Sequence, residues 1–317
     1  MPAFSGNQIA QWLYQQHVGS IDQMTNLSKK NRERLQQVCT VGCMAHVERL
    51  ESVDGTVKYL FPTLSGKRIE SVFIPDKDRG TLCVSCQVGC KMNCKFCATG
   101  KNGFKRNLFA HEIVSEILLA QQDTDLKITN VVFMGQGEPL DNFENLKRAI
   151  ELINKNLQIS IRRLTVSTCG IVPKISELSK CELLPTLAIS LHAPNHEIRK
   201  QVMPVENKYN MQELKNALLE YNKATKDRIT IEYILIGGLN DSIQCAKELI
   251  EYLKDIKCNI NLIPYNPIGL DDFKKPSKKD ILKFKYILEA SGKKVTIRLE
   301  RGADIDAACG QLAGKIS

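Results

Sequence analysis

The chain has 317 residues, of which 43% are hydrophobic and 25% charged, a balance typical of a folded protein with a sizeable core rather than a disordered one. An excess of 44 Lys and Arg over 35 Asp and Glu gives a formal charge of +9, which suits a polyanionic partner as well as an ordinary solvated surface. No apolar run approaches the roughly 18 residues of a membrane span, and no basic start leads into an apolar stretch, so we expect a cytoplasmic protein without membrane association.

Cysteine is unusually frequent, with 12 residues in the chain. Without an export signal we expect these thiols to stay reduced, which favours metal or redox chemistry over a disulfide framework. Five of them fall within one short segment: Cys83, Cys86, Cys90, Cys94 and Cys97. This segment is therefore the first candidate for a functional site.

The pattern of apolar residues divides the chain into three parts. Residues 1–47 contain helix-like stretches such as QIAQWLYQQ and SKKNRERLQQVC, which predict an N-terminal helical domain that could bind RNA. Residues 48–76 alternate apolar and polar positions around glycine turns, which predicts a linking unit of β-hairpins. Residues 77–317 alternate β-branched apolar runs with amphipathic stretches, which predicts repeated βα units followed by a C-terminal loop.

Repeated βα units imply a parallel sheet with right-handed crossovers. Six units and a final strand fall short of the eight of a closed barrel, so we predict an α/β fold with a partial (βα)6-type barrel. A doubly wound sheet is the alternative. Polar and unusual residues gather where each strand ends, which is where such folds hold their active sites.

The spacing Cys90-x3-Cys94-x2-Cys97 occurs on a loop after the first strand of the predicted barrel. Three thiolates spaced in this way suit a [4Fe–4S] cluster with one iron left open to a small ligand. The alternative is a zinc site built from two CxxC pairs, one of them holding Cys83 and Cys86. Strand alternation would turn Cys83 and Cys86 to opposite faces, and the spacer between the pairs is short, so we favour the iron–sulfur interpretation.

Two glycines and a carboxylate follow the second predicted strand, in the sequence MGQGEPL. Gly135 and Gly137 would let the backbone approach a ligand, and Glu138 can accept hydrogen bonds from an ammonium group. Taken alone, the segment is equally well an ordinary glycine turn. Later strand ends add single polar residues, each a weak signal, that would surround one mouth: Ser167, Ser190, His192 and Asn266.

The last motif is RGADIDAACGQLAG, which contains Cys309 between Ala308 and Gly310. Small neighbours would leave this thiol sterically open, although a small residue in a tight turn has the same appearance. Because the final predicted strand ends just before the loop, we expect Cys309 at the same mouth as the clustered cysteines.

Together these segments resemble the RlmN/Cfr family of radical S-adenosylmethionine adenine methyltransferases, and the resemblance runs from about residue 7 to residue 314. The most specific segments are TLCVSCQVGC, the cysteine loop, MGQGEPL, AISLHAPN, NLIPYNP and DIDAACGQLAG. The resemblance implies that a [4Fe–4S] cluster is bound by Cys90, Cys94 and Cys97. It also implies that S-adenosylmethionine, used twice per turnover, is contacted by Gly137, Glu138, Ser167, Ser190, Leu191, His192 and Asn266.

The resemblance further implies three catalytic residues. Cys309 would carry a methyl group as S-methylcysteine and then form a transient covalent adduct with the RNA. Glu70 would act as a general base, and Cys83 would release the product through a transient disulfide with Cys309. By its position alone, Glu70 is predicted to lie on the solvent face of an alternating strand.

The substrates implied are an adenosine of 23S rRNA at the peptidyl-transferase centre and the adenosine 3′ of the anticodon in tRNA, both methylated at C2. A low-potential electron donor such as flavodoxin or ferredoxin is also implied, and so is a monomeric enzyme.

Methylation at C8, as in the Cfr branch that confers antibiotic resistance, is the first alternative. A zinc-stabilised RNA-binding protein without catalysis is a more distant one. Cys86, in place of an expected serine, and the short N-terminal domain depart from the family pattern.

Overall fold

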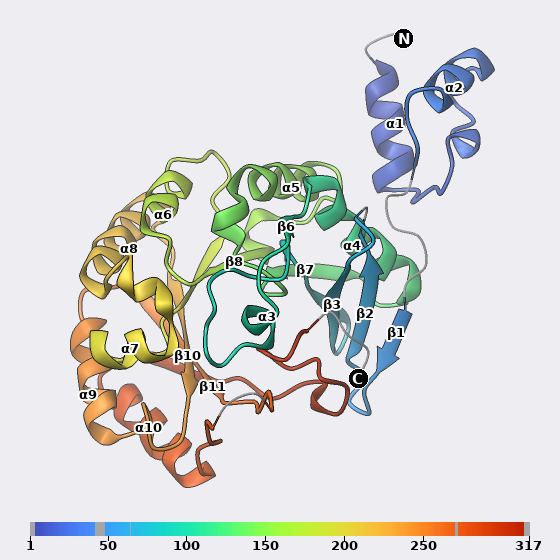
Figure 1. The fold of residues 1–317 in the computed structure, drawn as a ribbon. Helices are drawn as coiled ribbons and strands as arrows, with labels where there is room; N and C mark the ends of the chain where they lie inside the picture. Colours follow the sequence, from blue (N-terminus) through green and yellow to red (C-terminus); the bar gives the residue numbers. More distant parts are fainter. Residues whose placement is uncertain (1–3, 42–47, 64, 270–271, 314–317) are drawn as a thin grey trace.

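The computed structural model describes residues 4–41, 48–63, 65–269 and 272–313. Helices α1 (Phe4–Tyr14) and α2 (Lys29–Gln36) form an N-terminal part that projects from the body of the molecule (Figure 1). It contacts the body through Tyr14, which packs on the main core, and through the His17 carbonyl, which accepts from Gln122 at 3.0 Å. Its small core is centred on Ile21, Met24 and Leu27. The domain boundary predicted at residue 47 lies outside the described residues.

A ten-stranded sheet runs through the body of the molecule in the order β1-β2-β3-β4-β7-β8-β9-β10-β11-β12. The first four strands pair antiparallel, and every pair from β4 to β12 is parallel. The strands span Glu48–Glu51 (β1), Val57–Pro62 (β2), Arg68–Asp76 (β3), Arg79–Cys83 (β4), Ile128–Phe133 (β7), Leu164–Thr168 (β8), Thr186–Ser190 (β9), Ile229–Leu235 (β10), Cys258–Pro264 (β11) and Lys294–Ile297 (β12). A separate short ribbon pairs β5 (Gln87–Val88) with β6 (Arg106–Asn107).

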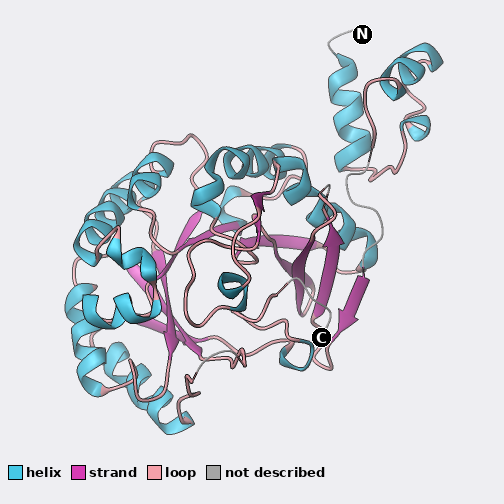
Figure 2. Ribbon diagram, in the orientation of Figure 1, coloured by secondary structure: helices cyan, strands magenta, loops and turns pink. Residues whose placement is uncertain are grey.

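Helices cover the outside of the curved sheet (Figure 2). They span Ala110–Asp123 (α4), Phe143–Lys155 (α5), Val172–Leu178 (α6), His196–Val202 (α7), Met211–Thr225 (α8), Ile243–Tyr252 (α9) and Lys278–Ala290 (α10). Their apolar faces pack on the strands in one large core. The short helix α3 (Ala98–Lys101) lies instead across the inside of the arc, beside the C-terminal segment.

Side-chain caps fix where several helices begin. Asn195, Asn210, Ser242 and Ser277 precede α7, α8, α9 and α10, and each side-chain oxygen accepts a hydrogen bond from a backbone amide of the first turn. Such caps satisfy amides that have no partner within the helix. These four caps therefore define the residue at which each helix begins.

The predicted partial barrel is confirmed, because the described chain contains seven parallel strands linked by six βα units and the sheet ends at β12 without closing. The hairpins of residues 48–76 are continuous with this sheet, since β3 pairs with β4. Among the described residues, no helix is both long enough and apolar enough to span a bilayer.

Candidate functional site

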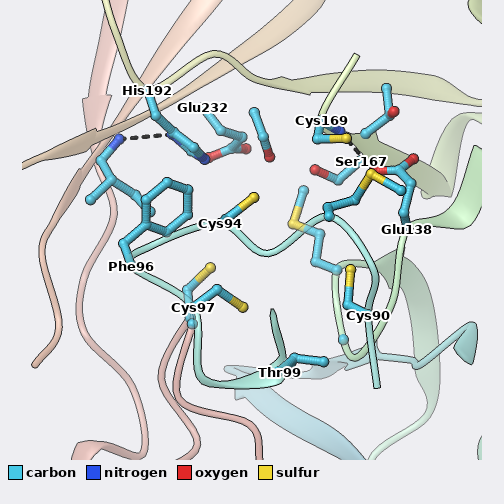
Figure 3. A pocket seen from close by; sticks show the side chains of 18 of the residues that line it. Cys90, Cys94, Phe96, Cys97, Thr99, Glu138, Ser167, Cys169, His192 and Glu232 are labelled. Carbon is cyan, nitrogen blue, oxygen red and sulfur yellow. Dashed lines mark hydrogen bonds between the residues drawn. The ribbon is translucent and has the colours of Figure 1, made fainter. Parts of the chain in front are cut away.

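A pocket lies where the parallel strands end, inside the arc of the sheet (Figure 3). Its wall combines the cysteine loop, the loops after β7, β8 and β9, and the C-terminal segment. The lining includes Cys90, Cys94, Cys97, Gly137, Glu138, Ser167, Ser190, His192 and Cys309. Nine of the residues singled out in the sequence thus meet in one place.

The three clustered cysteines lie on one loop, residues 89–105, which is the cysteine loop. The β5–β6 pair joins the two ends of this loop. Gly89 makes the narrow base of this loop possible. Its φ is +73°, and a Cβ there would lie 1.8 Å from the carbonyl oxygen of Gly103. The closed loop directs Cys90, Cys94 and Cys97 into the pocket.

The environment of these thiols suits an iron–sulfur cluster. Burial raises the pKa of Cys90 to about 12 and the pKa of Cys94 well above its ordinary value, and negative charge on Cys97 raises both pKa values further. A bound cationic group would offset this cost, because metal ligands must be thiolates. Among the described residues, no three His, Cys, Asp or Glu side chains converge closely enough to hold one metal ion. Three thiols that face one pocket therefore fit an iron–sulfur cluster.

Cys83 and Cys86 lie on different sides of the sheet. Cys83 packs with Val72, Ala307 and Leu312 under the C-terminal segment. Cys86 is only 1% exposed and packs in the main core between sheet and helices. The structure therefore does not assemble the two CxxC pairs into a zinc site, and Cys86 serves as a small apolar core residue.

Glu138 enters the pocket from the loop after β7. Gly137 has a φ of +100°, and a Cβ there would lie 2.5 Å from the Gln87 side chain, so only glycine allows the turn. The buried carboxylate of Glu138 accepts hydrogen bonds from the amides of Leu140 (3.0 Å) and Cys169 (2.8 Å). Burial nevertheless raises the pKa of Glu138, so a cation such as an ammonium group would stabilise its charge.

His192 lines the pocket after β9, and its ring packs edge-to-face with Phe96, the ring centres being 4.7 Å apart. Its Nδ1 accepts a hydrogen bond from the amide of Ile234 at 3.0 Å. Burial, followed by the positive charge of Arg199, lowers the pKa of His192 to about 3. The imidazole is therefore neutral, and Nε2 carries the proton and can donate.

Two predicted contacts lie outside this pocket's lining. Leu191 is fully buried behind it. Asn266 lines an adjoining cavity that shares Ile263, Arg298 and Cys309 with the first. The amide nitrogen of Asn266 donates to the Cys309 carbonyl at 3.2 Å, so the residue positions the C-terminal segment.

The C-terminal segment is bound to the cysteine loop through α3. The Ala98 amide donates to the Gly310 carbonyl at 2.7 Å, and the Thr99 hydroxyl donates to the Leu312 carbonyl at 2.6 Å. On its other side, Asp304 accepts from the Ser52 hydroxyl at 2.5 Å. These contacts hold Cys309 opposite the cluster cysteines, as the sequence predicted.

Cys83 and Cys309 share the neighbourhood of Arg298. Burial raises the pKa of Cys83 to about 12 and also raises the pKa of Cys309, while the positive charge of Arg298 lowers the pKa of each thiol. Negative charge on Cys309 raises the pKa of Cys83 in turn, and Cys83 packs in one cluster with Ala307 and Leu312, which flank Cys309 in the chain. Both are free thiols.

Glu70 is buried rather than solvent-facing, so the expectation from strand alternation is wrong. Its side chain is 1% exposed and forms an ion pair with Lys58, which is 3% exposed, at 3.4 Å. The Gln136 amide donates to the same carboxylate at 3.3 Å. Glu70 lies on the sheet face that also carries Cys83, because Val72 pairs with Cys83 two residues further along β3. It does not line the pocket.

Sequence reasoning missed several residues of the site. Cys169, Glu232, Met134 and Arg298 all line the pocket. Arg298 directs its guanidinium towards the sulfur of Met134 at 3.5 Å. The signal that could have found Cys169 and Arg298 is their place at or just after the ends of β8 and β12.

Two family models match the chain. One, the radical SAM superfamily, covers residues 84–253, and the other, the ribosomal RNA large subunit methyltransferase N-terminal domain, covers residues 2–41. The superfamily uses a [4Fe–4S] cluster and S-adenosylmethionine. The cysteine loop and Glu138 fall within the first match.

Curated relatives match almost the whole chain. The probable dual-specificity RNA methyltransferase RlmN of Lachnospira eligens is 46% identical over 315 residues, which cover 98% of this chain and 90% of the relative. The dual-specificity RNA methyltransferase RlmN of Marinobacter nauticus is also 46% identical, over 99% of this chain and 87% of its own.

Solved structures agree. A radical SAM methyltransferase from Sphaerobacter thermophilus has a TM-score of 0.95 at 40% identity, over 99% of this chain and 94% of that one. HydG, a maturase of the [FeFe]-hydrogenase, shares the fold alone, with a TM-score of 0.53 at 17% identity over 68% of this chain and 50% of its own. With a three-cysteine loop facing Cys309 and such likeness along its whole length, the chain belongs to the RlmN family of dual-specificity RNA methyltransferases, within the radical SAM superfamily.

Proposed function

We propose that this protein methylates C2 of an adenosine in 23S rRNA, at the peptidyl-transferase centre, and C2 of the adenosine 3′ of the anticodon in tRNA, with Cys309 as the methyl carrier. The observation that supports it best is the position of Cys309. This thiol lies in the wall shared by two adjoining cavities, one lined by the cluster cysteines and the other by Asn266 and Arg298. A thiol in that place can receive a group from one cavity and deliver it to a base in the other.

The residues divide into those that hold the cofactors and those that handle the methyl group. Bound to Cys90, Cys94 and Cys97, a [4Fe–4S] cluster would supply the electron that cleaves S-adenosylmethionine. The buried Glu138 would accept from the methionine ammonium, and the neutral His192 would donate from Nε2.

A carrier thiol suits the chemistry of the target atom. C2 of adenine lies between two ring nitrogens and is electron-poor, so it does not attack an electrophilic methyl group. Cys309 can do so, because its sulfur loses a proton and forms a bond to the methyl carbon while S-adenosylhomocysteine leaves. With the radical chemistry that a cluster and a second S-adenosylmethionine would supply, that methyl group would give one hydrogen atom to the 5′-deoxyadenosyl fragment, and its carbon would add to C2. The adduct would then lose one electron and hold the RNA on Cys309.

Release of the RNA is assigned to Cys83 and Glu70. Glu70 would take the proton from C2, and Cys83 would form a disulfide with Cys309 as the carbon–sulfur bond breaks and the freed carbon takes a proton. Burial raises the pKa of Cys83 to about 12, and the neighbouring Arg298 supports this role because the positive charge of its guanidinium lowers that pKa. The side-chain amide of Gln136 donates a hydrogen bond to the Glu70 carboxylate. Glu70 can therefore act as a base only after the Gln136 side chain moves away.

The expected partners follow from the substrates. A positive net charge of +9 favours RNA phosphates, and a cytoplasmic monomer that takes electrons from a flavodoxin or ferredoxin would meet the needs of the reaction.

The test is a turnover with cluster-loaded protein, S-adenosylmethionine, a reductant and either tRNA or an rRNA fragment, followed by mass spectrometry of the nucleosides. We expect 2-methyladenosine from the native chain. Cys309→Ala should keep its iron and sulfide but form none. Formation of 8-methyladenosine would support the C8 alternative, and colourless protein containing one zinc would refute the radical reaction.

A second variant tests the release step. Cys83→Ala should accept the methyl group and accumulate a protein–RNA adduct, visible as a slower band on a denaturing gel. Cys86→Ala is the matched control, because Cys86 lies three residues away but packs in the core. Release of free methylated RNA at the native rate by Cys83→Ala would contradict the role of Cys83.

A further inference from the structure

Arg199 is a fully buried arginine on α7 that lies behind the pocket. Its guanidinium forms hydrogen bonds with three backbone carbonyls, those of Cys169 (2.6 Å), Leu191 (3.2 Å) and Ser190 (3.4 Å). The first carbonyl lies just after β8 and the other two lie at the end of β9. One side chain therefore joins the ends of two neighbouring strands.

The charge of Arg199 is balanced by Glu206, whose carboxylate lies 2.5 Å from Nη1 and is also fully buried. Glu206 is fixed in turn by the amide of Met211, which donates to its other oxygen at 2.9 Å. Burying such a pair costs desolvation free energy that its attraction only roughly offsets, so stability alone does not explain its presence. What the pair provides is a rigid fork of donors behind the pocket.

The backbone held by this fork carries the groups that face the cofactor. The amide of Cys169 donates to Glu138, and residues 190–192 supply Ser190 and His192 to the lining. The same helix contacts the cysteine loop, since the Val202 carbonyl accepts from the amide of Lys95 at 2.9 Å. Arg199 thus lies at the junction of three segments that surround one site.

We propose that Arg199 is a positioning residue for S-adenosylmethionine: its guanidinium holds the ends of β8 and β9 so that Glu138, Ser190 and His192 converge on the cofactor, with Glu206 compensating its buried charge. This inference rests on the proposed cofactor contacts, and it is independent of which RNA atom is methylated. Arg199 itself does not line the pocket and touches no reacting atom.

Arg199→Lys is the sharpest variant. A lysine retains the ion pair with Glu206 but cannot reach three carbonyls with one ammonium group. We expect unchanged iron and sulfide content and a folded protein whose unfolding midpoint falls, because buried carbonyls lose their donor. The dissociation constant for S-adenosylmethionine should rise about tenfold, as the loss of one or two buried hydrogen bonds predicts. The double variant Arg199→Met with Glu206→Leu removes both charges, leaves no buried ion unpaired, and should show the same weakening.

The matched control is Arg106→Lys, because Arg106 also pairs with a buried glutamate, Glu112 at 2.7 Å, but lies outside the pocket lining. Its affinity for S-adenosylmethionine should equal that of the native chain. Binding is measured by equilibrium dialysis of cluster-loaded protein without RNA or reductant.

The outcomes are distinct. Native affinity, within about twofold, in a folded and cluster-loaded Arg199→Lys would overturn the proposal. Loss of the cluster together with S-adenosylmethionine, or failure of both Arg199 variants to fold, would make Arg199 a structural residue and would also overturn it. If the native, cluster-loaded chain itself bound no S-adenosylmethionine, the proposed function would fail instead.

Discussion

His192 is a neutral imidazole in a site with charged neighbours. Arg199 lies close enough for its charge to act on the His192 ring. The backbone amide of His192 donates to the backbone carbonyl of Glu232 at 3.4 Å. Burial, followed by the charge of Arg199, lowers the pKa of His192 to about 3, against about 6.5 in an unfolded chain. The folded protein therefore resists a proton that the unfolded chain takes up readily.

The sign of the resulting pH dependence follows from that difference. Above pH 6.5 both states are neutral at this residue and nothing is lost, whereas below it the unfolded state gains protons and stability falls as the pH falls. Between pH 7 and pH 5, this one residue lowers the free energy of unfolding of the native chain by about 2 kcal/mol. We expect the His192→Gln variant to lack that part of the decrease. Urea unfolding at both pH values measures this difference.

His111→Gln is the control for this experiment. His111 is exposed, with its ring stacked on Phe109, and its replacement should leave the native pH dependence in place. Equal slopes for His192→Gln and the native chain between pH 7 and pH 5 would show that His192 is not held neutral.

At the scale of elements, α3 and the C-terminal segment behave as one unit. The Thr99 hydroxyl is buried and donates to the Leu312 carbonyl at 2.6 Å. Thr99→Val keeps the shape but leaves that carbonyl without its donor, at a cost of about 1–2 kcal/mol. We expect amide hydrogen exchange in residues 307–313 to become about tenfold faster, measured by mass spectrometry.

Thr99→Ser retains the hydroxyl and should exchange at close to the native rate. Unchanged exchange in Thr99→Val would mean that the backbone bond from Ala98 to Gly310 holds the segment by itself.

The elements themselves were largely predictable from the sequence, because β-branched runs and amphipathic stretches alternate with a regular period. The position of Glu70 was not predictable. Alternation predicts a solvent face for β3, yet Ile69 to Phe73 are all buried. One face packs towards α4 and the other lies under the C-terminal segment, which is more than two hundred residues away in the chain.

The same reason explains what was and was not foreseen at the site. Cys90, Cys94 and Cys97 are close in sequence, so their spacing alone indicated a shared ligand. Arg199 donates to a backbone carbonyl and Arg298 contacts a methionine sulfur, and both partners lie on distant segments of the chain. A single arginine has no neighbouring residues in the sequence that would indicate such a contact. Their roles depend on tertiary packing.

At the scale of the whole molecule, the N-terminal part contributes to the net charge of +9. Helix α2 has no buried residue and carries four cationic side chains against one glutamate in the sequence KKNRERLQ. It stands with α1 away from the barrel, and α10 lies on the far side of the molecule in Figure 1. A polar helix of this kind, held by a small core of its own, is suited to bind a polyanion.

We therefore predict that the triple variant Lys29→Gln, Lys30→Gln and Arg34→Gln weakens RNA binding by a salt-dependent amount. Each lost phosphate contact reduces the steepness of log affinity against log salt by about 0.7–0.9, so the loss of three contacts should reduce it by about 2–3. Filter binding of tRNA between low and moderate KCl measures this slope, and the affinities of the two proteins should become equal at high salt.

The matched control removes three exposed lysines of α10, Lys278, Lys279 and Lys283. An equal change in both variants would mean that RNA responds only to net charge, and the N-terminal part would then have no specific role in binding.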